Sequence, residues 1–402
     1  MEGIAGIAGI AGIAAKQACP CGVMHREVRS TVQVGPGILD DVASLVQRLP
    51  VGSSCLLVCD QNTYEAAGKW VVLQLEQAGK RVQMLQYVRQ GPLTADEHAL
   101  GELAFELSAK LDFLVGVGSG TISDLVRYTA HIVGVPFILI ATAPSMDGYA
   151  STVAPLVQKG SKRTFQAKEP LAIVGDTDVL ANAPPYMIVA GVGDLLGKFI
   201  AKADWKLGHR ITGEPYCPVI QEQVDQALDL CLGEMKRCCL ADRRFVQVVM
   251  EGLILSGQAI TMFGNSRPAS GSDHHLAHFW EMKALEQGRT IGLHGQKVGL
   301  GTRIMLQLYA EVAQRVQDSD RADLRDLFAS LMSDLPSVSE YDALLKTASI
   351  DFAPSTLGIT ADWIEEGLLK AMYVRDRYTI LRFASSQGWL EELASTVLRD
   401  YK

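Results

Sequence analysis

The feature that most constrains this sequence is a regular alternation of short apolar runs and longer amphipathic segments between Arg26 and Leu180. Apolar runs of about five residues, spaced by amphipathic helices, are typical of a parallel β-sheet with helical crossovers. We therefore predict five strands: Cys55–Asp60, Arg81–Val88, Phe113–Val117, Pro136–Thr142 and Leu171–Gly175. The helices predicted between them are Asn62–Lys80, Thr94–Lys110 and Thr121–Gly134.

The pattern changes after Pro184 and Pro185, where strand-like runs largely stop. Long helical patterns follow, at Met187–Leu207, Val219–Cys239 and Arg244–Met262, and continue to the end of the chain. With 402 residues the chain is long enough for more than one domain. We expect a low-complexity tail over residues 1–25, an α/β domain over 26–183 and an all-α domain over 184–402.

Charge and hydropathy narrow the classes of partner. There are 37 basic and 45 acidic residues, and the net charge of −8 excludes a broad basic surface for nucleic acid. No run reaches the roughly 18 apolar residues of a membrane span, so we expect no membrane partner. Glu2 precedes the Gly-Ile-Ala repeat at Gly3–Ala15, where a signal peptide would be positive, and we interpret the repeat as a tail.

The eight cysteines are scattered along the chain, which favours reduced thiols in a cytoplasmic protein over a disulfide framework. Cys19 and Cys21 lie close to His25, but no second cysteine pair follows at zinc-finger spacing. We therefore do not predict zinc at this segment.

A glycine-rich turn joins the strand that begins at Phe113 to the helix that follows. Gly116, Gly118 and Gly120 would let backbone N–H groups approach a phosphate, and the helix N-terminus adds partial positive charge. The third glycine comes too soon for the dinucleotide motif GxGxxG. A tight turn without a ligand is therefore the alternative.

Two aspartates follow predicted strands. Asp60 ends the first clear strand, where a carboxylate can accept hydrogen bonds from ribose hydroxyls and would repel the 2′-phosphate of NADP. This role favours NAD, and the alternative is that Asp60 only caps the next helix. Asp147 follows a buried strand, on the side where open α/β sheets bind ligands; the alternative is that it only shapes a turn.

Four of the eight histidines fall between His274 and His294. His274 and His278 are four residues apart and project from one helical face, whereas His275 points elsewhere. This concentration favours a metal site, and the alternative is a solvated face. The best carboxylate donor is Asp194, at the start of the second domain's first helix; its alternative role is to stabilise that helix. We expect Ser270 with Asp273, or Ser272 alone, to cap the helix of His274.

One carboxylate and two neutral imidazoles would leave a divalent ion with residual positive charge and an open coordination position. That arrangement is typical of a catalytic metal site and not of a closed structural one. The sequence therefore predicts an enzyme with one divalent ion in its helical half.

Five short motifs occur in a particular order: the glycine loop, TAPSMDG at 142–148, GDLLGK at 193–198, HHLAH at 274–278 and LHG at 293–295. Together they resemble the sn-glycerol-1-phosphate dehydrogenase family, within the superfamily of glycerol dehydrogenase, iron-containing alcohol dehydrogenases and dehydroquinate synthase. The resemblance covers nearly all of the chain from Arg29. It implies a Rossmann-like domain and a helical domain with the active site in the cleft between them.

The resemblance also implies the reaction, which is reversible NAD(P)-linked reduction of dihydroxyacetone phosphate to sn-glycerol 1-phosphate. Asp147 and His278 match substrate-contacting positions, where they would orient hydroxyl groups and His278 could relay a proton. Asp194, His274 and His294 match the metal ligands, and Asp194 is counted with the substrate site. Family members use zinc, nickel or iron, so the metal stays open. The positions that match dinucleotide contacts are Asp60, Gly118, Ser119, Gly120, Thr121, Ile122, Thr142, Ala143, Pro144, Ser145 and Ser151.

Three alternatives remain. A polyol dehydrogenase would act on unphosphorylated glycerol or another diol, and a dehydroquinate-synthase-like cyclase would return its NAD unchanged. A non-catalytic binding protein is disfavoured by the complete Asp/His/His set. Lys198, Lys202 and Arg163 are the candidate cations for a substrate phosphate, although solvated helix charges are the alternative for each. We expect a homodimer, because helix-rich second domains often pair.

Overall fold

The computed structural model describes residues 19–237, 240 and 242–401, which belong to two compact units. Of these described residues, the first unit contains Cys19, Met24–Ile188 and those between 240 and 265. The second contains Pro20–Val23, 189–237 and 266–401. The Gly-Ile-Ala repeat lies outside the described residues.

The first unit is built on a six-stranded parallel sheet with the order β1-β8-β5-β4-β2-β3. All five predicted strands are confirmed, and the parallel α/β fold class with them. Sequence analysis missed β1, an edge strand that pairs only with β8 within this sheet and is largely half-exposed. The strands are β1 (Thr31–Gly35), β2 (Ser54–Asp60), β3 (Arg81–Tyr87), β4 (Phe113–Gly118), β5 (Phe137–Ala141) and β8 (Ala172–Asp176).

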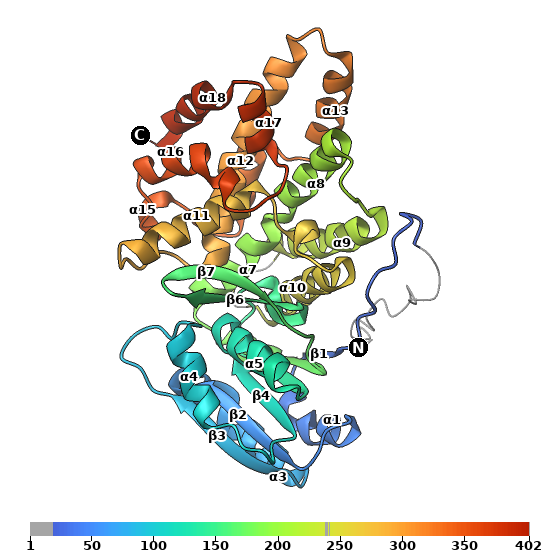
Figure 1. Ribbon diagram of the computed structural model, residues 1–402, viewed down its shortest axis with the longest axis vertical. Helices are drawn as coiled ribbons and strands as arrows, with labels where there is room; N and C mark the ends of the chain where they lie inside the picture. The colour runs from blue at the N-terminus through green and yellow to red at the C-terminus, as the bar shows by residue number, and fades with distance from the viewer. Residues whose placement is uncertain (1–18, 238–239, 241, 402) are drawn as a thin grey trace. The chain divides into compact units, whose positions relative to one another are not determined.

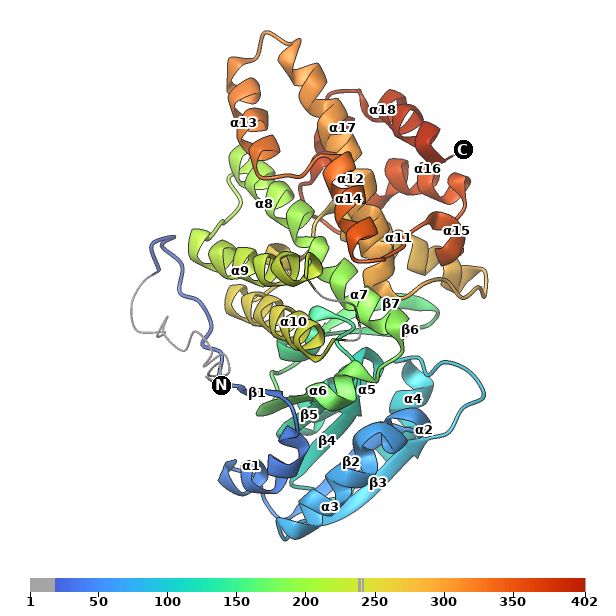
Figure 2. The same cartoon turned by 180° about the vertical axis from the view of Figure 1, so that it is seen from behind.

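Helices cover both faces of this sheet (Figures 1 and 2). On one face, α1 (Val42–Arg48) and α3 (Lys69–Gln77) pack on strand residues such as Leu57, Val115 and Ile140. The other face carries α4 (Glu97–Phe105) and α5 (Gly120–Val133). Shorter elements of this unit are η1 (Ile38–Asp41), α2 (Gln61–Thr63), η2 (Tyr64–Gly68), η3 (Asp147–Ala150) and α6 (Thr177–Ala181). Both faces are therefore buried, as the continuous apolar strands require.

Sequence analysis also missed an antiparallel hairpin of β6 (Val153–Gln158) and β7 (Ser161–Gln166) in this unit. Four of the six residues of β7 are exposed, and the segment has no continuous apolar run to mark it as a strand. The turn uses Gly160, whose φ of 70° is readily adopted only by glycine.

The long helix α10 (Arg243–Phe263) belongs to the first unit, although its sequence lies inside the range 184–402 expected to form one helical domain. It packs on η3, α6 and β1. Gly257 lets it approach closely, since a Cβ there would lie 2.4 Å from the carbonyl oxygen of Asp147. The helix is long and apolar enough to cross a membrane, with a mean hydropathy of 1.4, but 83% of that window is buried inside the protein. We interpret α10 as a core helix.

Every described element of the second unit is helical, as expected. The predicted helix Met187–Leu207 is divided at Gly197 into α7 and α8. The long helix α12 packs on α11, α13 and α18, and Figure 1 shows this group of helices. The helices that carry or support the site are α7 (Pro185–Leu196), α8 (Lys198–Thr212), η4 (Arg267–Ala269), α11 (Ser272–Glu286), α12 (His294–Gln317), η5 (Ala371–Tyr373) and α17 (Ile380–Ser386). The others are α9 (Pro218–Met235), α13 (Ala322–Ser333), α14 (Val338–Thr347), α15 (Pro354–Leu357), α16 (Ala361–Lys370), α18 (Leu390–Val397) and η6 (Leu398–Tyr401).

Candidate active site

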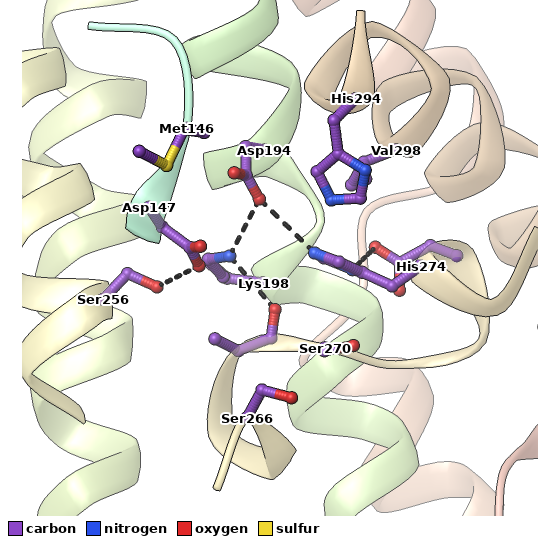
Figure 3. Close-up of polar contacts among 12 residues, drawn as sticks. Met146, Asp147, Asp194, Lys198, Ser256, Ser266, Ser270, His274, His294 and Val298 are labelled. Atoms are coloured by element: carbon purple, nitrogen blue, oxygen red, sulfur yellow. Dashed lines mark hydrogen bonds and ion pairs between the residues drawn. The ribbon is translucent and has the colours of Figure 1, made fainter. Parts of the chain in front are cut away.

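The second unit brings together one carboxylate and two imidazoles from three different helices. Asp194 lies near the end of α7, and not at the start of a helix as the sequence analysis expected. His274 lies on α11, and His294 is the first residue of α12. One potential ligand atom from each lies within 4.8 Å of the other two. Figure 3 shows the three side chains directed toward one another. Sequence spacing alone could not predict this arrangement, because Asp194 is far from both histidines in the sequence.

Glycines allow the three helices to approach closely enough for this. A Cβ on Gly295 would lie 1.8 Å from the carbonyl oxygen of Ala190, and one on Gly193 would lie 2.1 Å from that of Gly295. A Cβ on Gly197 would lie 2.5 Å from Asp273 Oδ2. Backbone therefore packs on backbone where α12 begins beside α7, which places His294 near Asp194.

Two further carboxylates orient the imidazoles. His274 Nδ1 lies 3.1 Å from Asp273 Oδ2, and His294 Nδ1 lies 2.8 Å from Glu281 Oε1. Each contact fixes Nδ1 as the protonated nitrogen and leaves Nε2 for a metal, the arrangement typical of metal-binding histidines. Sequence analysis did not assign Asp273 or Glu281 this role, although Asp273 adjoins His274 and Glu281 lies three residues after His278.

The electrostatics of this cluster favour a bound cation. Burial would raise the pKa of Asp194, but Lys198 and the two imidazoles hold that pKa well below its usual range. Burial opposes protonation of His274, yet Asp273 and Asp194 outweigh it and raise its pKa to about 9. His274 Nε2 lies 3.4 Å from Asp194 Oδ1. A divalent ion would replace the proton on that nitrogen, so the donor set fits a metal.

Lys198 lies one helical turn beyond Asp194 and is fully buried. Its ammonium group lies 3.2 Å from Asp194 Oδ1 and donates to the carbonyl oxygen of Ala269 at 3.0 Å (Figure 3). Lys202, the second candidate phosphate ligand, forms an ion pair of 3.0 Å with Asp225 and is 4.0 Å from Asp334. These carboxylates neutralise Lys202. Arg163 lies on β7 of the other unit.

His278 lies beside the candidate metal donors but does not belong to the group formed by Asp194, His274 and His294. Its Nδ1 is 3.1 Å from Glu281 Oε2, and its Nε2 is 2.9 Å from Nη2 of Arg375. Its ring stacks on that of His294 with centroids 5.1 Å apart. Burial, and then Arg375, hold the pKa of His278 well below 6.5. The ring is therefore neutral, and its Nε2 is a hydrogen-bond acceptor.

These histidines contribute to two groups of potential metal donors, Asp194 with His274 and His294, and His278 with Glu281 and His294. His275 belongs to neither group. It is fully buried, and its two ring nitrogens have no hydrogen-bond partner within the part of the chain that the structure describes. Burial, and then three nearby arginines, hold its pKa well below 6.5. His275 is thus a neutral core residue.

The cap predicted for the helix of His274 is wrong. The N-cap residue of α11 is Gly271, and it makes no side-chain cap. Asp204 of α8 supplies the acceptor instead, since its Oδ2 accepts the backbone N–H of Ser272 at 2.6 Å. Its Oδ1 accepts from the backbone N–H of Ile380 and the hydroxyl of Tyr309. A buried carboxylate distant in sequence therefore replaces the local serines as the cap.

The first unit carries the residues matched to dinucleotide contacts. Asp60 caps α2: its Oδ1 accepts the backbone N–H groups of Asn62 and Thr63, both at 2.8 Å. The structural alternative for Asp60 is thus observed. Both bonds use Oδ1, so capping alone does not engage Oδ2.

The glycine loop lies where β4 ends and α5 begins. Ser119 is the N-cap residue of α5 but makes no side-chain cap, so its hydroxyl does not cover the first turn. The next stretch follows β5, and the backbone N–H of Thr142 donates to the carbonyl of Gly118 at 3.2 Å. Two loops thus meet at the carboxyl ends of neighbouring parallel strands, where open sheets bind nucleotides. They carry Gly118, Ser119, Gly120, Thr121, Ile122, Thr142, Ala143, Pro144 and Ser145.

Asp147 lies in the same unit, at the first residue of η3. Its Oδ2 accepts a hydrogen bond of 2.9 Å from Ser256 of α10 (Figure 3). Buried Arg127 of α5 donates to the carbonyl of Tyr149 and so fixes this turn. Ser151 follows it, and its hydroxyl accepts from the backbone N–H of Val153 at 3.0 Å. Sequence analysis missed Ser256, which lies far from Asp147 in the chain.

The short cysteine segment gains a neighbour that spacing could not show. In the second unit, the thiols of Cys21 and Cys217 lie within 4.8 Å of each other. Cys217 is the N-cap residue of α9. The sequence, which has no second cysteine pair nearby, therefore did not show that Cys217 lies next to Cys21 after folding.

Comparison with known proteins agrees with this architecture. Residues 33–184 match the family model described as iron-containing alcohol dehydrogenase. The structure of an iron-containing alcohol dehydrogenase from Thermococcus thioreducens is similar, with a TM-score of 0.69 and 14% identity over 92% of this chain and 99% of that chain. At this identity the likeness shows the fold alone, a Rossmann-like domain followed by helices.

Two relatives named glycerol-1-phosphate dehydrogenase [NAD(P)+] are closer in sequence. The one from Halalkalibacterium halodurans is 34% identical over 90% of this chain and 94% of its own length. The one from Bacillus licheniformis is 33% identical over 94% of each chain. The chain therefore belongs to the glycerol-1-phosphate dehydrogenase family and is an oxidoreductase. NAD(P) and a divalent metal are the cofactors expected of that family.

Proposed function

We propose that this chain interconverts dihydroxyacetone phosphate and sn-glycerol 1-phosphate, using NAD in preference to NADP and one divalent ion. The observation that carries the proposal is the donor set of Asp194, His274 and His294, gathered within 4.8 Å on a chain of this family. The dinucleotide would bind the loops at the carboxyl ends of β4 and β5.

The metal would be held by Asp194 Oδ1 and by Nε2 of His274 and His294. When bound, a divalent ion supplies a Lewis acid that stabilises negative charge developing on the substrate oxygen during hydride transfer. Asp273 and Glu281 keep both imidazoles in the tautomer that offers Nε2. The ionised Asp194 offsets part of the charge, and zinc, nickel and iron all remain suited to this set of ligands.

His278 and Asp147 are the residues we propose to orient substrate hydroxyls. Neutral His278 has an acceptor at Nε2, where a substrate hydroxyl would compete with Arg375. Its Nδ1 is tied to Glu281, so the ring can take a proton at one nitrogen while the other stays paired with a carboxylate. Asp147 has a carboxylate fixed by Ser256, which supports its use as a hydroxyl acceptor.

The preference for NAD rests on Asp60, whose carboxylate would accept the ribose hydroxyls and repel a 2′-phosphate. We further propose that the protein acts as a homodimer in the cytoplasm. The scattered thiols support a reducing compartment.

The test is an assay of purified protein loaded with zinc, nickel or iron, given dihydroxyacetone phosphate or dihydroxyacetone with NADH or NADPH. The proposal expects net NADH oxidation with the phosphorylated substrate, and sn-glycerol 1-phosphate as the product. Equal kcat/KM with both substrates would instead favour a polyol dehydrogenase. Conversion of a substrate without net NADH consumption would favour a cyclase.

A further inference from the structure

Two arginines converge beside His278, in the segment between η5 and α17. Arg375 and Arg377 are both half-buried, whereas the side chain of Asp376 between them is 98% exposed. Neighbours two residues apart therefore point to one side, and the intervening carboxylate points away from them. The acid closest in sequence, Asp376, is therefore not directed toward the two guanidinium groups.

Both guanidinium groups donate to neutral oxygen atoms in the segment before α11. Arg375 Nη1 donates to Ser266 Oγ at 3.0 Å, and Arg377 Nη2 donates to the same oxygen at 2.9 Å. Arg377 Nη1 also donates to the carbonyl of Ser270 at 3.3 Å. Ser266 and Ser270 lie on either side of η4, before α11 begins at Ser272, and both are labelled in Figure 3. One serine hydroxyl thus lies where two guanidinium groups meet.

Arg377 is short of negative charge. Across residues 19–237, 240 and 242–401, no carboxylate oxygen comes within 4.0 Å of its guanidinium. Burial, and then Arg375 and Arg267, lower its pKa to about 9, and Glu214 only partly offsets them. Arg267 has its own counter-ion, since Nε is 3.2 Å from both oxygens of Glu214. The site has the electrostatics of one that binds an anion.

Arg375 connects this cluster to the candidate active site. Its Nη2 lies 2.9 Å from His278 Nε2, and His278 stacks on the metal donor His294. The two other candidate cations in this unit each lie against a carboxylate, Lys198 against Asp194 and Lys202 against Asp225. A substrate held by His278 and the metal would therefore extend toward the arginines.

We propose that Arg375 and Arg377, with the hydroxyls of Ser266 and Ser270, form the site that binds the phosphate group of the substrate. Planar guanidinium groups suit phosphate because they offer paired N–H donors in a fixed fork. The proposal rests on the proposed function for the identity of the substrate, but the site itself recognises any phosphate monoester dianion or inorganic phosphate. It assigns specificity over unphosphorylated diols to Arg375 and Arg377.

Arg377 gives the sharper test, because Arg375 also touches His278. In Arg377→Ala, kcat/KM for dihydroxyacetone phosphate should fall about 10- to 100-fold relative to kcat/KM for dihydroxyacetone, since a charged hydrogen bond is lost. Arg377→Lys keeps the charge but not the fork, and should recover only part of that ratio. Arg382→Ala is the matched control, because Arg382 pairs with exposed Asp376 at 3.1 Å and should leave the ratio unchanged.

Binding of inorganic phosphate to the metal-loaded protein, measured by calorimetry, separates this inference from the proposed function. The site predicts at least a 10-fold weaker affinity in Arg377→Ala than in Arg382→Ala. If the natural chain reduces dihydroxyacetone phosphate and Arg377→Ala keeps both the substrate ratio and phosphate affinity, the site is wrong. If the natural chain lacks that activity but phosphate binding still depends on Arg377, the proposed function is wrong and the anion site stands.

Discussion

The proposed metal donors and the proposed nucleotide loops differ in which part of the chain would contact the ligand. In the second unit the donors are side chains, and each imidazole is fixed by the carboxylate of another side chain. In the first unit the loops offer mainly backbone, at the end of β4 and the uncapped start of α5. The comparison teaches that loss of one side chain should affect the metal site severely, whereas the nucleotide loops should tolerate most single substitutions.

Removal of the metal tests the claim that activity depends on the proposed metal site. Treatment with a chelator should lower turnover about 1,000-fold or more, because a Lewis acid contributes several kcal/mol to transition-state stabilisation. NADH binding, followed by fluorescence titration, should change little, because the proposed cofactor residues lie in the other unit. Re-addition of one divalent ion should restore turnover. Full activity of the metal-free protein would break the comparison.

Replacement of Glu281 tests whether carboxylates really prepare the imidazoles. In Glu281→Gln the partner of His294 Nδ1 loses its charge, and metal affinity should fall about 10- to 100-fold. The measurement is competition with a chelating dye. Glu286→Gln, at the end of the same helix and outside both donor groups, is the control. Equal metal affinity in the two variants would mean that Glu281 only supports packing.

The smallest effect is expected in the first unit. Asp60→Ser should change the ratio of kcat/KM for NADH over NADPH by about 10-fold toward NADPH, because the repulsion of a 2′-phosphate is removed. Serine still caps α2, so the helix should keep its start. An unchanged ratio would leave Asp60 with its capping role alone.

The sequence predicted what residue identity and periodicity encode. Apolar runs revealed five strands, and the concentration of histidines pointed to His274 and His294. The roles of Glu281 and Asp204, and the convergence of Arg375 and Arg377, depend on helices that meet only after folding. Periodicity also identified α10 as a helix, but it could not show that α10 packs in the first unit. The period of apolar residues shows which face of a helix is buried, and not which other elements cover that face.

The central claim is that Asp194, His274 and His294 hold one divalent ion, and metal content per chain measures it directly. Elemental analysis should find one ion per chain in the unmodified protein, and in His275→Ala and His278→Ala. His274→Ala and His294→Ala should lose the metal while keeping the fold, which circular dichroism would check. His278→Ala should keep its metal and lose activity. Full metal occupancy in His274→Ala, or metal loss in His275→Ala, would contradict the account.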